Sequence, residues 1–339
     1  MRGVWGRWRR ALECQWYGGG AWADALVPLG TLFCAAGRWR RQHCHGTQGA
    51  IPSIVVGNLG VGGSAKTPAS LAIVQYLRDR GWAPALVSRG YGAHPPREPY
   101  AVQLDDSPDR AGDEPLLLRQ LAPVYLGRRR LDAIAAAALG GHDVAVLDDG
   151  FQHLALAPHL RLLLLQGARP FGNGRCLPAG PLREPASAVS YADALLYDGA
   201  AGETPWITDA RQPVFGFAIC PQSCTALGGG GQTWPLSSLR GVRLHAVTGI
   251  ARPERFQALL ESLGAQVVLH AFPDHYRFRP EDLAAIPRPL VMTAKDAVKC
   301  RSFPDIRDCW VVNIGMEIEP GFWNWMDRHL AAWREMHDH

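Results

Sequence analysis

The sequence is short of lysine and of charge in general. Only Lys66, Lys295 and Lys299 are lysine, although Lys and Arg together number 35 in the 339 residues. A lysine that remains in such an arginine-rich chain marks a position to examine. Charged residues make up 19%, which is below the usual quarter, while 47% of the residues are hydrophobic. This balance excludes a disordered chain and suffices for two buried cores.

Cysteine pairs at metal-site spacing are also missing. The eight cysteines are scattered, and no signal peptide with a cleavage site precedes them, so we expect reduced thiols in a cytoplasmic setting. The stretches His43-Cys44-His45 and Cys220-x-x-x-Cys224 lack a second half at zinc-site spacing. No zinc site is therefore predicted.

A long apolar run is absent from the N-terminal segment, residues 1–45. The stretch from Ala25 to Gly37 is apolar for about a dozen residues, too few for a helix to cross roughly 30 Å of hydrocarbon. Helical spacing instead gathers aromatic and apolar side chains on one face, namely Trp5, Trp8, Leu12 and Trp16. Much of the positive charge lies nearby, at Arg2, Arg7, Arg9, Arg10, Arg38, Arg40 and Arg41. This pattern favours an interfacial helix on an anionic membrane surface; the alternative is that the aromatic residues pack on the domain behind them.

From Ile51 onward, apolar strands alternate with helical stretches. Strands are predicted at residues 53–56, 85–88, 124–127, 144–147, 160–165, 194–197, 244–247, 267–271, 290–293 and 311–314. This order predicts an α/β fold with a doubly wound, mostly parallel sheet. We expect a core domain over residues 46–211 and a smaller α/β domain over residues 212–339 that closes a cleft. The stretch Ala168–Pro185 is rich in Gly and Pro and is expected to form a long ordered loop.

A glycine-rich loop follows the first of these strands and precedes a helix. In a phosphate-binding loop (P-loop), backbone N–H groups hold phosphate oxygens, a lysine reaches the outer phosphates and a hydroxyl holds Mg²⁺. The corresponding residues are Gly60, Val61, Gly62, Gly63, Ser64, Ala65, Lys66 and Thr67. Ala65 stands where the pattern asks for glycine, which costs about 1 kcal/mol or more if its φ must be positive. The alternative is an ordinary glycine-rich turn.

Acidic residues occur at two places where they could serve such a loop. Asp148 and Asp149 end an apolar strand, as a Mg²⁺-ordering carboxylate does in P-loop enzymes, although strand-end acids also cap turns. Asp113 and Glu114 begin a helix, where acids are also favoured by the helix dipole alone. His275 follows a strand of the second domain and would tune a carboxylate if it faces the cleft.

Together these stretches resemble the tetraacyldisaccharide 4'-kinase family of lipid A biosynthesis. The similarity runs in order through GNLGVGGSAKTP, SRGYG, GDEP, DDGFQH, GNGRCLPAGPLREP, HAVTGIARPERF, FPDH and TAKDAVKC. It implies a kinase dependent on ATP and Mg²⁺, at the cytoplasmic face of the bacterial inner membrane, that phosphorylates the 4'-hydroxyl of an acylated disaccharide 1-phosphate. The departure from the family is Ala65, normally glycine.

The resemblance also implies roles for individual residues. Lys66 and Thr67 match the loop lysine and the hydroxyl on the Mg²⁺ side. Asp113 and His275 match a proposed catalytic pair. Acids around the metal are matched by Glu114, Asp148 and Asp149.

Two other functions fit a P-loop with strand-end acids. A GTPase or metal-insertion ATPase is one, but the guanine-reading [NT]-K-x-D motif is absent, because Lys295 is followed directly by Asp296 and neither other lysine fits. A non-catalytic, membrane-associated nucleotide-binding module is the other, and the retained polar residues argue against it.

Overall fold

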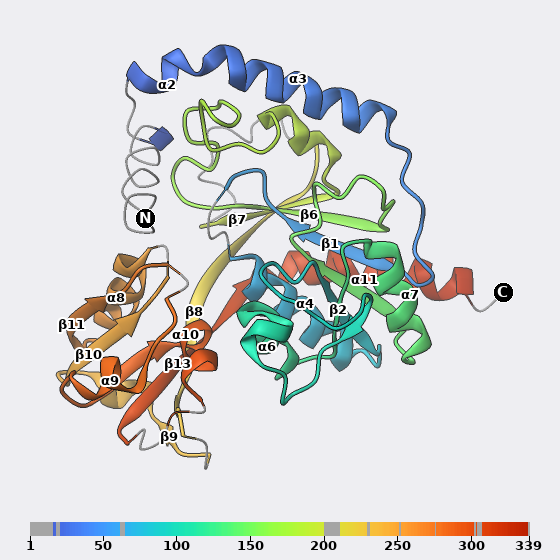
Figure 1. Cartoon of the computed structure of the whole chain (residues 1–339). Coiled ribbons are helices and arrows are strands. Elements are labelled where there is room, and N and C mark those ends of the chain that lie inside the picture. Colours follow the sequence, from blue (N-terminus) through green and yellow to red (C-terminus); the bar gives the residue numbers. More distant parts are fainter. Residues whose placement is uncertain are drawn as a thin grey trace.

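One continuous sheet forms the centre of the molecule. The computed structural model describes residues 16–17, 21–61, 65–199, 211–228, 231–250, 252–274, 276–301, 303 and 307–337, and within these residues the sheet has thirteen strands with helices on both faces (Figure 1). The strand order is β11-β10-β12-β13-β8-β7-β6-β1-β5-β2-β4-β3, with β9 paired to β8. Only the β13–β8, β8–β9 and β3–β4 pairs are antiparallel among these strands. The predicted α/β class and mostly parallel sheet are confirmed.

The N-terminal half of the sheet is built around β1. Its strands are β1 (Ser53–Gly57), β2 (Pro84–Ser88), β3 (Tyr100–Ala101), β4 (Val124–Leu126), β5 (Val144–Asp148), β6 (Leu160–Leu165) and β7 (Ala194–Asp198). All five residues of β1 and of β5 are buried, which explains why both read as continuous apolar runs in the sequence. The helices of this half are α4 (Lys66–Asp79), α5 (Pro108–Ala111), α6 (Asp113–Arg119) and α7 (Arg130–Leu139), with a 3₁₀ turn at Ala186–Tyr191.

Alternate residues of β1 enter different cores. Ile54 and Val56 lie in the core with α4, whereas Val55 lies in the core with Ile134 of α7. This is the alternation expected of a strand that is covered on both faces.

The C-terminal half continues the same sheet. Its strands are β8 (Val214–Ala226), β9 (Thr233–Trp234), β10 (Arg243–Thr248), β11 (Gln266–Ala271), β12 (Leu290–Thr293) and β13 (Cys309–Ile318), and its helices are α8 (Pro253–Ser262), α9 (Pro280–Ala284) and α10 (Ala294–Cys300), with a 3₁₀ turn at Leu236–Leu239. The sequence did not predict β8, and it predicted β13 too short. Pro221 interrupts the apolar pattern of β8, and the β8–β13 register shifts between Asn313 and Ile314 opposite it, as a bulge accommodates a proline.

Helix α11 (Pro320–His337) returns from the end of β13 to the N-terminal half (Figure 1). Its buried residues Phe322, Met326 and Leu330 share a core with Ile54 of β1. Tyr76 of α4 donates a hydrogen bond to the carbonyl oxygen of Trp323 at 3.0 Å. The packing of α11 thus ties the end of the chain to the N-terminal half of the sheet.

Helices α2 (Ala21–Ala25) and α3 (Val27–His43) cross the outer side of the loop 168–185 (Figure 1). A Cβ atom at Gly30 would lie 2.9 Å from the carbonyl oxygen of Cys176, so only glycine permits this close approach. Arg41, at the far end of α3, donates to both carboxylate oxygens of Glu184 at 2.7 and 2.8 Å and to the carbonyl oxygen of Phe151 at 3.1 Å. One face of α3 is thus fixed to the loop.

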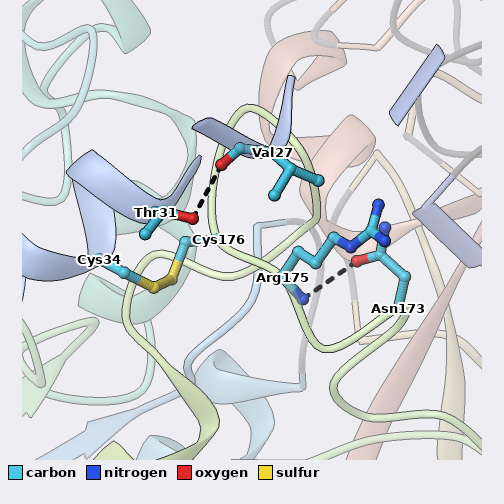
Figure 2. Close-up of a disulfide and its surroundings, with 6 residues drawn as sticks. All are labelled: Val27, Thr31, Cys34, Asn173, Arg175 and Cys176. Atoms are coloured by element: carbon cyan, nitrogen blue, oxygen red, sulfur yellow. Dashed lines mark hydrogen bonds between the residues drawn. A yellow bond between two sulfur atoms is a disulfide. The ribbon is translucent and has the colours of Figure 1, made fainter. Parts of the chain in front are cut away.

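A disulfide makes this attachment covalent. Cys34 of α3 is bonded to Cys176 of the loop, as Figure 2 shows beside Thr31 and Arg175. The sequence predicted reduced thiols, and that expectation is wrong for this pair, because two cysteines 142 positions apart meet where α3 touches the loop. Cys44, Cys220, Cys224, Cys300 and Cys309 are free.

Two further expectations about the N-terminal segment need correction. Trp16 is buried and donates a hydrogen bond from Nε1 to the carbonyl oxygen of Pro178 at 3.1 Å, so it packs on the loop and not toward a membrane. The side chain of Arg41 is only 8% exposed and paired with Glu184, so it adds no surface charge. Trp5, Trp8 and Leu12 lie outside the described residues.

We predict that the Cys34–Cys176 bond stabilises the fold. Closing a loop of this length removes entropy from the unfolded chain worth up to about 5 kcal/mol in the chain-entropy model. Cys34→Ser in oxidised protein is expected to lower the free energy of unfolding by at least about 2 kcal/mol in a urea titration. Cys44→Ser, which removes an exposed free thiol, is the control and is expected to leave it unchanged. If Cys34→Ser and Cys44→Ser had the same free energy of unfolding in oxidised protein, and reductant changed neither, the predicted stabilisation by the disulfide would be contradicted.

Candidate active site

The glycine-rich loop joins β1 to α4, in the order that a P-loop requires. Gly62, Gly63 and Ser64 lie outside the described residues. The preceding part is braced by the loop 168–185, because the N–H of Val61 donates to the carbonyl oxygen of Pro181 at 2.9 Å. Gly60 forms an isolated bridge with Leu182 of the same loop.

Ala65 adopts the left-handed conformation, with φ 55° and ψ 18°, directly before α4. Glycine takes this conformation freely, whereas an L-residue with a Cβ atom pays roughly 1–2 kcal/mol for it. The alanine that stands here in place of glycine therefore carries backbone strain. This is the costlier of the two possibilities in the sequence analysis, a positive φ.

Lys66 is held at the first turn of α4 by groups from two strand ends. Its ammonium lies 2.9 Å from Oδ1 of Asp149 and 3.2 Å from Oδ1 of Asn58. Asn58 is itself fixed, since its Nδ2 donates to the carbonyl oxygen of Gly60 and its own carbonyl accepts from Gln152. The predicted loop lysine is thus positioned beside the glycine-rich loop.

Thr67 and Asp148 meet on the other side of the helix start. Thr67 Oγ1 donates to Asp148 Oδ2 at 3.2 Å, while Asp148 Oδ1 is buried and has no hydrogen-bond partner. Burial raises the pKa of Asp148 to about 7; Lys66 opposes the rise, and the negative charges of Glu114 and Asp149 add to it. A buried carboxylate oxygen without a partner is a position that a cation would satisfy.

Asp149 has a different role from its neighbour. Its φ is 57°, and its carboxylate accepts two hydrogen bonds from Arg183 at 3.1 Å in addition to the contact with Lys66. Burial alone would raise the pKa of Asp149, but Lys66 and Arg183 outweigh it and lower the pKa. Asp149 therefore remains a carboxylate that orders two cations of the protein.

Asp113 and Glu114 begin α6, after Gly112 with φ 86°. Lys299 Nζ lies 3.6 Å from Asp113 Oδ2, and Lys295 Nζ lies 2.9 Å from Glu114 Oε1. Both lysines belong to α10, so the two acids are held by the C-terminal half of the sheet as well as by the helix N-terminus.

These residues line one large cleft, with a volume of about 2420 Å³. Lys66, Thr67, Asp113, Glu114, Asp148 and Asp149 all border it. From the C-terminal half it is bordered by Asp274 and by the lysines of α10. His275, predicted from the sequence, lies outside the described residues, between Asp274 and Tyr276.

Arginines form another wall of the cleft. Arg89 follows β2, and Arg130, at the start of α7, donates from Nη1 to the carbonyl oxygen of Gly127 at 2.6 Å. Burial lowers the pKa of His153, and Arg130 and Arg89 lower it further. A wall with this charge suits an anionic ligand.

Sequence reasoning missed the residues that fix the predicted ones in place. These residues all lie in the motifs of the resemblance, but no role was given to them in the sequence analysis: Asn58, Gln152, Arg183, Lys295 and Lys299. The two lysines were noted for the scarcity of lysine.

Known proteins are similar to this chain in sequence. A sequence model of the family described as "Tetraacyldisaccharide-1-P 4'-kinase" matches residues 22–331. The tetraacyldisaccharide 4'-kinase of Acidithiobacillus ferrooxidans is 54% identical over 96% of this chain and 99% of its own length. The enzyme of the same name from Azotobacter vinelandii is 43% identical over 95% and 97%.

A solved structure is similar as well. The crystal structure of the "apo" form of LpxK from Aquifex aeolicus in complex with ATP matches with a TM-score of 0.74 and 25% identity, covering 91% of this chain and 99% of that one. The family match spans most of the chain, and the relatives are matched over nearly their whole lengths. This chain belongs to the tetraacyldisaccharide-1-P 4'-kinase family.

Proposed function

We propose that this protein transfers the γ-phosphate of ATP to the 4'-hydroxyl of a tetraacylated glucosamine disaccharide 1-phosphate. The observation that carries the proposal is the junction of β1 and α4, where Lys66 contacts Asp149 and Thr67 donates a hydrogen bond to Asp148. Phosphoryl transfer depends chiefly on holding donor and acceptor in line and on neutralising charge. The cleft is large enough for both a nucleotide and a disaccharide head group.

Mg²⁺ fits the donor set at this junction. Thr67 Oγ1 and the partnerless Oδ1 of Asp148 are hard oxygen ligands, and Mg²⁺ in such sites takes one or two protein ligands together with phosphate oxygens. Among the described residues there is no cluster of three or more His, Cys, Asp or Glu side chains that would hold a metal alone. When bound, Mg²⁺ would neutralise negative charge on the phosphates.

The two neighbouring acids are therefore assigned different tasks. Asp148, with a free oxygen, would hold the metal together with Thr67, whereas Asp149, already bonded to Lys66 and Arg183, would orient the lysine toward the phosphates. Glu114 borders the same cleft and raises the pKa of Asp148, so it lies near enough to act on the metal electrostatically.

Asp113 is proposed as the general base for the acceptor hydroxyl. It lies at the start of α6 on the cleft, its side chain 19% exposed, where a bound sugar would reach it. His275 is proposed to support it. General base catalysis of this kind contributes about 10²- to 10⁴-fold to the rate.

The membrane surface is the proposed place of action, at the cytoplasmic face of the bacterial inner membrane. Among the helices that the structure describes, none combines the length and apolarity needed to cross a bilayer. The outward face of α3 nevertheless exposes large apolar side chains, with exposed fractions of 56% for Leu29, 68% for Leu32, 44% for Phe33 and 61% for Trp39. These side chains lie opposite the face fixed to the loop, so they are free to enter the headgroup zone.

The first test is transfer of labelled γ-phosphate from ATP to the tetraacyl disaccharide 1-phosphate in detergent micelles. Wild type is expected to form the lipid product, and Lys66→Ala to lower turnover by at least about a hundredfold, because the loop loses its cation. Asp113→Ala is expected to lose about 10²- to 10⁴-fold. ATP binding without a lipid product from the wild type would reject the proposed reaction.

Ala65→Gly is expected to stabilise the protein. Glycine removes the left-handed strain of roughly 1–2 kcal/mol but makes the unfolded chain more flexible by about 0.4–1 kcal/mol, which leaves a net gain of about 0.5–1 kcal/mol. Ala65→Val, which places a β-branched residue in the same conformation, is the matched control and is expected to destabilise. Urea denaturation measures both; a loss of stability with glycine comparable to that with valine would mean that Ala65 is unstrained.

Membrane binding is tested on α3. Leu32→Asp with Phe33→Asp is expected to weaken binding to anionic vesicles at least about tenfold, because two apolar side chains no longer enter the interface. Thr31→Asp with Ala35→Asp adds the same charge to exposed positions on another side of the helix and serves as the control. Equal loss with both pairs would indicate a charge effect alone.

A further inference from the structure

The two lysines outside the glycine-rich loop occupy one face of α10. Lys295 and Lys299 are four residues apart, and each contacts one of two adjacent carboxylates at the start of α6. Residues four apart on a helix are neighbours, so the pair of lysines matches the pair of acids. These contacts join the C-terminal half of the sheet to the N-terminal half, and Figure 1 shows α10 beside α6.

Lys299 is the more deeply enclosed of the two. Its side chain is 6% exposed, against 23% for Lys295. Its ammonium lies 3.2 Å from Asp296 Oδ1 and faces the ring of Phe278, with 5.9 Å to the ring centre. A lysine enclosed in this way has few alternative positions for its charge.

Asp296 makes this position rigid. It is fully buried, and its Oδ2 accepts hydrogen bonds from Thr248 Oγ1 at 2.9 Å, Thr293 Oγ1 at 2.8 Å and the N–H of Gly249 at 3.1 Å. Oδ1 is left for Lys299. A buried carboxylate with every oxygen satisfied fixes its partner cation precisely in space.

We propose that Lys299 is a positioning residue for Asp113. Anchored by Asp296, it places a fixed positive charge 3.6 Å from the Asp113 carboxylate and so holds that carboxylate on the cleft, in the orientation that receives the acceptor hydroxyl. This role rests on the proposed function, in which Asp113 is the general base.

The position of Lys299 in the chain gives this contact a second consequence. Asp113 belongs to the N-terminal half of the sheet, and its orienting charge comes from the C-terminal half. The base is therefore complete only when α10 and α6 are docked. A lysine that served stability alone would not need to reach a carboxylate of the other half, because Asp296 already compensates its charge.

Lys299→Met tests this role in the lipid phosphorylation assay. We expect kcat to fall about 10- to 100-fold while KM for ATP stays within about threefold, because the base is misplaced and the nucleotide loop is intact. Lys299→Arg, which keeps a cation between the two carboxylates, is expected to recover most of the loss. Binding of a fluorescent ATP analogue confirms that each variant is folded.

Arg301→Met is the matched control. Arg301 directly follows α10 and donates a hydrogen bond to Gln120, the residue after α6, so it joins the same two helices at the end of α6 that lies farther along the chain from Asp113 and Glu114. Its loss is expected to change kcat less than about twofold. An equal loss of kcat in both variants would assign the effect to docking in general and overturn the specific role of Lys299.

A double substitution separates positioning from structure. In an Asp113→Asn background, adding Lys299→Met is expected to lower kcat by less than about twofold, because residues that act as a unit are not additive. A full additional loss would overturn the proposal, as would wild-type kcat in Lys299→Met alone. If wild type formed no lipid product while binding ATP, the proposed function would fail, which is a different outcome from an active wild type with an unaffected Lys299 variant.

Discussion

The register between β1 and β5 determines where the site forms. These parallel strands pair Val56 with Asp148, so both end at the same edge of the sheet, and the chain leaving each enters the same space. The glycine-rich loop and Lys66 follow β1, whereas Asp149 follows β5. A shift of one residue would turn Ile54 and Val56 out of their core and would separate Thr67 from Asp148.

The loop 168–185 is the second constraint, because it supports the site from one side and α3 from the other. Arg183 in this loop bonds Asp149, and the next residue, Glu184, holds Arg41 of α3. The segment was predicted as an ordered loop of unassigned role. Of its two adjacent residues, Arg183 binds the active-site carboxylate of Asp149 and Glu184 binds Arg41 of α3. The position of α3 is therefore coupled to the position of Asp149.

Local patterns in the sequence predicted the elements that bury their own apolar residues. β1 and β5 were predicted because each is a continuous apolar run, and α4 was predicted because a helix follows the glycine-rich loop in the P-loop pattern. β8 was missed because Pro221 and polar residues break its alternation, and it is a strand through its pairing with β7, β9 and β13. Tertiary pairing of this kind leaves no local trace in a single sequence.

The candidate site divides in the same way. Lys66, Thr67, Asp113, Glu114, Asp148 and Asp149 were predicted because their motifs are contiguous, and the structure brings all six to one cleft. Trp16 and Arg41 were misjudged because their partners, Pro178 and Glu184, are more than 140 positions away. The sequence alone could not decide whether the φ angle of Ala65 is positive or negative, because this angle depends on how the loop joins α4.

The long β8–β13 pair limits how the two halves of the sheet can move relative to each other. β8 pairs with β7 of the N-terminal half and along most of its length with β13, in strands of 13 and 10 residues. Relative movement of the two halves must therefore bend or twist this ribbon. Such a ribbon resists bending along its whole length and does not act as a hinge at a single residue. Because α10 leads into β13, bending of this ribbon changes where Lys295 and Lys299 meet the two acids of α6.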